Sequence, residues 1–204
     1  MYTSEDERIY IAAADCTGHG VPGAMVSVVC ANALDRATKE FELPHTGEIL
    51  DKVSELVVEQ FEKSGEEVKD GMDIALCSLD PETLTVEFSG ANNPLWLKRK
   101  HESIITSFRG DRQPIGNYHQ SKPFSSQTIQ CEKGDWIYIF SDGYADQFGG
   151  VNEKKFKSTK MKSLLLEISK LSAKEQEKRL ILEFNNWKGE LEQLDDVCVI
   201  GIKI

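Results

Sequence analysis

Aspartates at the ends of apolar segments are the residues of this sequence that could do chemistry together. Asp15 follows residues 9–14, Asp142 follows residues 136–140, and Asp195 and Asp196 precede residues 197–204. Each segment is short and apolar, which is typical of a buried β-strand. If these strand ends lie side by side, their carboxylates form an oxygen-rich cluster suited to Mg²⁺ or Mn²⁺. Crowded carboxylates repel one another without a cation, so their convergence would imply a metal.

The segment after Asp15 predicts a sharp change of direction. It contains three glycines, which permit tight backbone, and Pro22, which suits the first turn of a helix. Apolar residues then follow at helical spacing over residues 24–34. Asp15 is therefore expected at a strand-to-helix junction. Taken singly, each aspartate could equally be a helix cap, a turn residue or a charge guarding a sheet edge.

Length, composition and charge narrow the class of protein. The 204 residues suit one domain spanning residues 1–204, and 40% hydrophobic and 28% charged residues are ordinary for a globular chain. The formal net charge of −10 argues against nucleic acid or an anionic membrane as partner. It allows a phosphoprotein substrate, because bound cations would reverse the local field.

Cysteines and hydropathy predict a cytoplasmic location. The five cysteines are far apart, form no CxxC pair, and mostly fall in apolar segments, so we expect reduced core residues. No apolar run approaches the ~20 residues of a membrane span. The acidic, polar start is unlike a signal peptide.

The period of the apolar residues predicts a mixture of helices and antiparallel strands. Residues 80–83, Asp-Pro-Glu-Thr, favour a hairpin turn, and residues 172–175 resemble a helix capping box. The predicted helices cover residues 22–41, 46–64, 160–171 and 172–187. Besides the three strands next to aspartates, predicted strands cover residues 72–79, 84–89, 94–98, 103–108 and 126–131.

Three ordered motifs, ADCTGHGVPGA, SDGYADQFGG and DDVCVIGI, resemble those of the PPM (type 2C) metal-dependent protein serine/threonine phosphatases, in particular the bacterial SpoIIE/RsbU-type branch. The intervening GANNPLWLKR and QPIG are also similar to that branch. The resemblance runs from about Ile9 to the last residue. It implies an α+β fold, a four-layer α-β-β-α sandwich of two antiparallel sheets flanked by helices, with two metal ions at one end between the sheets.

The same resemblance implies hydrolysis of phosphoserine or phosphothreonine in a bacterial signalling protein, by water that two Mn²⁺ or Mg²⁺ ions activate. Domains of this branch act on small partners such as an anti-sigma-factor antagonist. The residue matching Asp15 would bridge both cations, and Cys16 would contribute only its backbone carbonyl. Asp142 and Asp195 would complete the carboxylates of one cation. Asp146 matches a residue near water on a weaker metal, although a solvated acid at a helix start is the alternative.

His19 is a further candidate, as a general acid that protonates the leaving alkoxide, because imidazole titrates near neutrality. In eukaryotic relatives the corresponding histidine directly follows an Asp-Gly pair. Here Thr17 and Gly18 intervene. A turn or helix-start residue is the alternative for His19.

The beginning of the chain departs from the family pattern. Relatives have an earlier strand, roughly GDFY-like, that carries an acidic metal ligand and pairs with the strand leading to the first aspartate. Nothing before Ile9 matches it. We therefore expect a domain truncated at that strand, with a depleted metal site and an exposed sheet edge that could form a homodimer. The alternative function is an inactive pseudo-phosphatase that acts as a binding module; a metal-dependent nuclease is disfavoured by the acidic composition.

Overall fold

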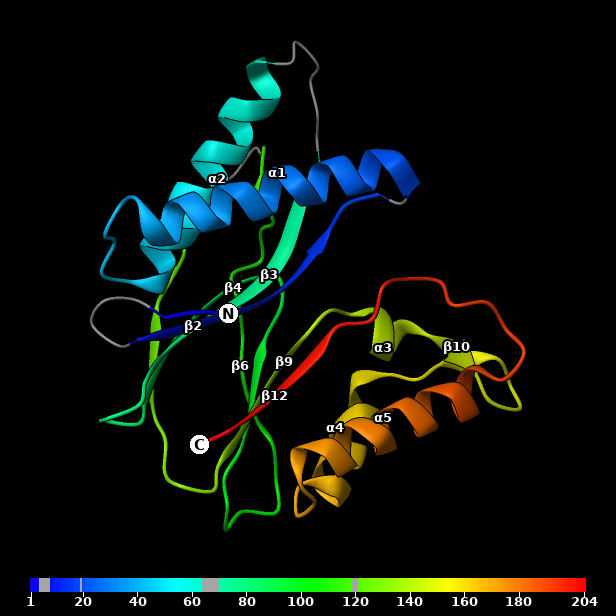
Figure 1. The fold of residues 1–204 in the computed structure, drawn as a ribbon. Coiled ribbons are helices and arrows are strands. Elements are labelled where there is room, and N and C mark those ends of the chain that lie inside the picture. The colour runs from blue at the N-terminus through cyan, green and yellow to red at the C-terminus, as the bar shows by residue number, and fades with distance from the viewer. Residues whose placement is uncertain (4–7, 19, 64–69, 119–120) are drawn as a thin grey trace.

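The structure is a computed structural model that describes residues 1–3, 8–18, 20–63, 70–118 and 121–204. Two antiparallel sheets lie between two pairs of helices (Figure 1). The first sheet has the order β1 (Tyr2–Thr3), β2 (Ile9–Cys16), β3 (Gly71–Asp80), β4 (Thr85–Ala91) and β8 (Gln127–Gln130), and β7 (Ile115–Gly116) also pairs with β3. The second has the order β12 (Val199–Lys203), β9 (Trp136–Phe140), β5 (Leu95–Lys98) and β6 (Thr106–Phe108).

The helices cover the outer faces of the two sheets. α1 (Gly20–Lys39) and α2 (Thr46–Lys63) lie on one side of the strands, and α4 (Ser158–Ile168) and α5 (Ala173–Lys188) lie on the other (Figure 1). A short helix, α3 (Gly143–Asp146), and the hairpin of β10 (Phe148–Gly149) and β11 (Lys154–Lys155) connect β9 to α4. This arrangement is the predicted α-β-β-α sandwich. None of the helices in the described ranges combines the length and the apolar character that a membrane crossing requires.

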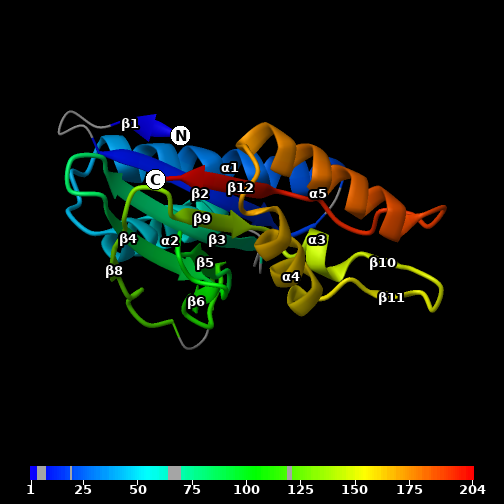
Figure 2. The same ribbon diagram turned by 90° about the horizontal axis from the view of Figure 1, so that it is seen from below.

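Three layers of buried side chains hold the four layers of structure together. α1 and α2 pack on one face of β3 through residues such as Val53, Val57 and Ile74. Between the sheets, Ala75 and Phe88 pack against side chains of β9 and β5. In Figure 2, β12 and β9 lie in front of β2 and β3, in agreement with two stacked sheets. The third layer, between the second sheet and the later helices, is rich in aromatic residues, including Tyr138, Tyr144, Phe156 and Phe184.

Alternation along β2 and β3 determines which side chains enter the space between the sheets. In β3, Met72 and Ile74 pack toward the helices, whereas Ala75 and Cys77 pack between the sheets. Because successive side chains of a strand point to opposite faces, Asp73 belongs to the inter-sheet face. The same rule places Asp15 of β2 on the face of Ala13, and that face is the one directed at the second sheet.

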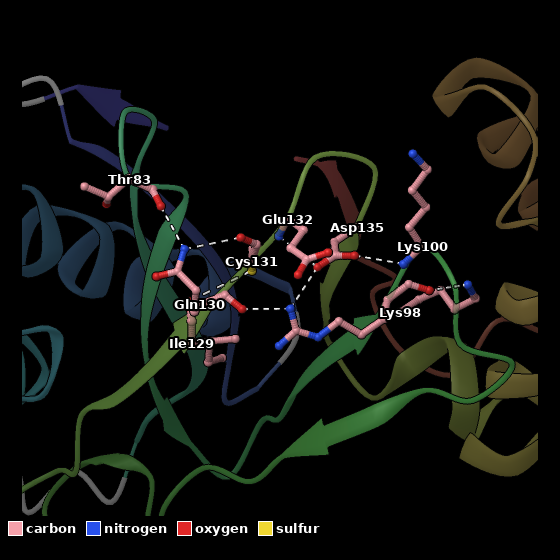
Figure 3. Close-up of polar contacts among 9 residues, drawn as sticks. Thr83, Lys98, Lys100, Ile129, Gln130, Cys131, Glu132 and Asp135 are labelled. Carbon is pink, nitrogen blue, oxygen red and sulfur yellow. Dashed lines mark hydrogen bonds and ion pairs between the residues drawn. The ribbon is translucent and has the colours of Figure 1, made fainter.

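A buried carboxylate fixes the start of β9, the strand that leads to Asp142. Asp135 is 1% exposed and accepts hydrogen bonds from the backbone N–H of Lys100 (2.8 Å) and of Glu132 (3.0 Å) (Figure 3). Arg99 adds an ion pair at 3.0 Å. A buried charge is tolerated only when it is paired and hydrogen-bonded, and here it joins the turn before β9 to the end of β5.

Local sequence signals for the helices agree with the structure. The predicted capping box is present: the backbone N–H of Ser172 donates to Glu175 (2.9 Å), and the Ser172 side chain accepts from the backbone of Glu175. α1 ends at Lys39, two residues before the predicted Phe41. Cys30, Cys77 and Cys131 are buried as expected, whereas Cys16 and Cys198 are half-buried, and all five are free thiols.

A two-residue strand precedes β2, although residues 1–8 do not contain the GDFY-like motif of the family's earlier strand. Tyr2 and Thr3 form β1 and pair with Tyr10 and Ile9 of β2. The ring of Tyr2 stacks on that of Tyr10 at 6.1 Å, and such cross-strand aromatic pairs stabilise a sheet. From Ile11 onward, β2 pairs only with β3 in the part of the chain that the structure describes, so β1 covers only the first two residues of that edge.

Candidate metal centre

Asp15, Asp142 and Asp195 come together at one end of the sandwich. Each offers a carboxylate oxygen, and these oxygens all lie within 4.8 Å of one another. Asp15 is half-buried, and Asp142 and Asp195 are exposed. The first sheet contributes Asp15 near the end of β2, and the second contributes the residues after β9 and before β12. Residues that lie between 53 and 180 positions apart in the sequence thus form one acidic cluster, as the sequence predicted.

The turn after Asp15 is held by glycines and by Thr17. Gly18 has a φ of +89°, a backbone conformation that favours glycine. A Cβ on Gly23 would lie 2.5 Å from the Gly18 carbonyl oxygen, so the start of α1 can pack against this turn only through glycine. The Thr17 backbone donates to the Gly71 carbonyl (3.0 Å), and the Gly71 N–H donates to Thr17 Oγ1 (3.0 Å). The end of β2, which carries Asp15, therefore continues into a turn that is anchored to the neighbouring strand β3.

Ser141 positions the two carboxylates of the second sheet. Its Oγ donates to the Asp196 carbonyl (3.0 Å) and accepts from the Cys198 N–H (3.0 Å), and its own N–H donates to the Cys198 carbonyl (3.0 Å). These bonds fasten the approach to β12 onto the end of β9, directly before Asp142. A Cβ on Gly143 would lie 2.3 Å from the Asp196 carbonyl oxygen, so glycine is needed there for the two segments to meet.

The electrostatics of the cluster favour cation binding. Burial, followed by the charges of Asp195 and Asp142, raises the pKa of Asp15 to about 6. Burial also raises the pKa of Asp142, with Asp195 adding to the effect. Asp15 and Asp142 are thus harder to ionise because of burial and of the neighbouring charges, and a bound cation would reverse this cost.

Cys16 and Asp146 lie close to the cluster but outside the group of three carboxylates. Cys16 lines the same cavity, yet its side chain packs with the core beneath α1 and α2, so its backbone is the part available to a metal. Asp146, four residues after Asp142, forms a 2.6 Å ion pair with Lys155 of β11. His19 lies outside the described residues.

Two further polar residues line the site, and the sequence analysis assigned neither of them a role in metal binding. The cavity of about 330 Å³ that contains the three carboxylates also includes Asp73 and Asn93. Asn92 donates from its side-chain amide to Asp73 Oδ1 at 2.8 Å. Asp73 was detectable as the one charged residue in the otherwise apolar segment 72–77.

The donors of this centre fit a hard divalent cation. They are carboxylate oxygens, with amide and backbone oxygens nearby, and this is the ligand set that Mg²⁺ and Mn²⁺ prefer. No histidine or thiol joins the cluster among the described residues. A zinc site of the nitrogen and sulfur type would need such ligands.

The sandwich and its acidic centre between the sheets define a PP2C-like serine/threonine phosphatase domain. The structure resembles the SiaA-PP2C domain of Pseudomonas aeruginosa (TM-score 0.84, 22% identity, covering 97% of this chain and 80% of that one). The chain belongs to the SpoIIE family, because the model of Stage II sporulation protein E (SpoIIE) matches residues 5–204.

Two longer structures share the fold. One is the PP2C phosphatase domain with a fragment of the regulatory domain of SpoIIE from Bacillus subtilis (TM-score 0.72, 16% identity, covering 96% of this chain and 53% of that one). The other contains RsbU and RsbW domains from Mycobacterium tuberculosis (TM-score 0.71, 19% identity, covering 96% of this chain and 51% of that one). This chain therefore spans about half of each. No curated protein sequence matches it closely enough to count as a relative.

Proposed function

We propose that this domain hydrolyses phosphoserine or phosphothreonine in a bacterial signalling protein, using Mn²⁺ or Mg²⁺ held at the carboxylate centre. The observation that carries the proposal is the proximity of the Asp15, Asp142 and Asp195 carboxylates, within 4.8 Å, at the open end of a PP2C-like sandwich. Divalent cations in such a centre supply an activated water and neutralise phosphoryl oxygens.

The residues of the chain then have separate roles. Asp15 lies on the face of β2 directed at the second sheet and would share its carboxylate between cations, with the Cys16 backbone beside it. Asp142 and Asp195 would hold a cation from the second sheet, where Ser141 fastens the segment before β12 to the end of β9. Asp146 is a weaker ligand candidate, since Lys155 already pairs with it.

The proposed substrate is a small phosphoprotein similar to an anti-sigma-factor antagonist. One structural neighbour contains RsbU and RsbW domains, and another comes from the bacterial stressosome, a modular system that controls secondary messenger signalling. The net charge of −10 disfavours a nucleic acid and makes cations at the site important for any phosphorylated partner.

The test compares the wild-type chain with Asp142→Asn and, as a matched control, Asp35→Asn, an exposed charge on α1. We expect Mn²⁺-dependent hydrolysis of p-nitrophenyl phosphate and of a phosphoserine peptide by the wild type and the control. Asp142→Asn should be at least about 100-fold slower, since even partners of metal ligands contribute 10–100-fold. Equal rates for all three proteins, at the background level, would instead support a non-catalytic binding module.

A further inference from the structure

We propose that Asp73 supplies a carboxylate to a second divalent cation, held between Asp73 and Asp15 at the first sheet. The inference deepens the proposed function and rests on it for the class of ligand, a hard cation such as Mn²⁺. Asp73 is outside the group of three carboxylates that meet within 4.8 Å, although it lines the same cavity. It would therefore contribute to a separate cation position next to Asp15, its partner in the first sheet.

The register of the first sheet brings the two side chains together. Asp15 of β2 is the direct antiparallel partner of Asp73 of β3. Side chains directly opposite each other in an antiparallel pair project on the same face, with their Cβ atoms about 4.5–5.5 Å apart. That spacing allows two carboxylates to take one cation between them.

The pairing is unfavourable unless a cation is present. Like charges directly opposite each other destabilise a sheet. In the described part of the chain, no ion pair joins Asp15 or Asp73 to a lysine or arginine. The surrounding charges make the cost larger, because Asp142 and Asp195 lie across the same cavity.

Asn92 holds the Asp73 carboxylate in place. Its Nδ2 donates to Asp73 Oδ1 at 2.8 Å, which orients the second oxygen, Oδ2, without neutralising the charge. The backbone of Asn92 is itself fixed, because its N–H donates to the Asp111 carbonyl at 2.8 Å. A neutral amide that orients a carboxylate is a typical outer partner of a metal ligand.

Asn93 gives independent evidence that the cavity receives a polar ligand. Its side chain is 7% exposed and lines the cavity, and its Nδ2 has no hydrogen-bond partner. A buried amide without an acceptor is unfavourable, and most buried polar groups in proteins are satisfied. The oxygen of a phosphate, or of water that enters with a cation, would satisfy it.

The experiment counts bound Mn²⁺ per chain, by calorimetric titration and by the electron paramagnetic resonance signal of free Mn²⁺. The wild type and Asp35→Asn should bind two ions, and Asp73→Asn should bind one. Asparagine retains the shape of aspartate and an oxygen that accepts from Asn92. The melting temperature of Asp73→Asn in EDTA should equal or exceed that of the wild type, and this measurement verifies that the variant folds.

A second variant tests the positioning role. Asn92→Ala should keep both ions but bind the weaker one about 10–100-fold less tightly, with the tighter one unchanged. If the wild type binds fewer than two ions, or if Asp73→Asn still binds two, the assignment of Asp73 is overturned. Unchanged affinity in Asn92→Ala would remove the positioning role.

The count of ions is independent of turnover, so the two proposals fail separately. A chain that binds two Mn²⁺, loses one in Asp73→Asn and hydrolyses nothing would refute the phosphatase proposal and support the role of Asp73. Mn²⁺-dependent hydrolysis together with an unchanged number of bound ions in Asp73→Asn would support the phosphatase proposal and refute the role of Asp73.

Discussion

Replacing Asp15 by asparagine should stabilise the metal-free domain while it removes metal binding. The pKa of Asp15 rises from 3.8 to about 6 in the folded chain, mainly through burial and then through Asp195 and Asp142. The folded state therefore holds the Asp15 proton more tightly than the unfolded state. The stability of the metal-free chain must fall as the pH rises from about 4 to above 6.

The size of the effect follows from that shift. The difference between 3.8 and about 6 corresponds to about 3 kcal/mol. Because Asp15 is only half-buried and water screens its neighbours, we expect about 1–2 kcal/mol in the measured free energy of unfolding. At pH 7.5 the full amount should appear as extra stability of Asp15→Asn. At pH 4.5, where Asp15 of the folded wild type is largely protonated, only about one third should remain.

Urea denaturation in EDTA at the two pH values measures this difference, with Asp35→Asn as the control for removing an acidic charge. The control loses a surface ion pair with Lys39 and should change stability by no more than about 0.5 kcal/mol at either pH. Addition of Mn²⁺ should raise the stability of the wild type and leave Asp15→Asn unaffected. An Asp15→Asn chain that is less stable than the wild type in EDTA at pH 7.5 would refute the reasoning.

Other predictions concern the stability of the second sheet and of the helix α4 that packs on it. Asp135→Ala should lower the free energy of unfolding by about 3 kcal/mol, because Arg99 and two backbone N–H groups lose their acceptor; urea denaturation will measure it. Tyr138→Phe removes a buried hydrogen bond to Gln176 (2.9 Å) and should cost about 1 kcal/mol by the same assay; no change would mean that Gln176 finds another partner. Met161→Ala should lower the free energy of unfolding by about 2–5 kcal/mol, since Met161 is 0% exposed; a smaller loss would show that α4 collapses onto the cavity.

Local patterns in the sequence were sufficient to predict most of the helices and longer strands. The helical spacing in α2 and α4 and the capping box at Ser172 are determined by neighbouring residues, so they could be predicted without tertiary information. The pairing partners of the short strands could not be predicted in this way. β7 and β10 have two residues each, and such segments are strands only because β3 or β11 lies next to them.

The start of the chain illustrates the same limit. Tyr2 and Thr3 have no periodic pattern of their own, and the family motif expected before Ile9 is not present in residues 1–8. Two contacts accompany their pairing with β2: Tyr2 stacks on Tyr10, and Lys39 Nζ of α1 lies 5.5 Å from the centre of the Tyr2 ring. Those contacts are known only once α1 has been placed across the sheet.

The residues of the candidate site also fall into two groups: those that local sequence could predict and those that it could not. Asp15, Asp142 and Asp195 could be predicted because each stands beside a strand that its own sequence reveals. Asp73 could be noticed only as a charge that breaks an apolar strand, and its meaning depends on the register that places it opposite Asp15. A slip of one residue would turn Asp73 to the helix-covered face. A charge that interrupts an apolar strand and lies opposite a second charge destabilises the folded state. Sequences accept such local conflicts mainly at functional sites. A bound cation would convert this conflict into a set of ligands, so measuring how Mn²⁺ binding changes between the wild type and Asp73→Asn tests whether function is the reason the conflict exists.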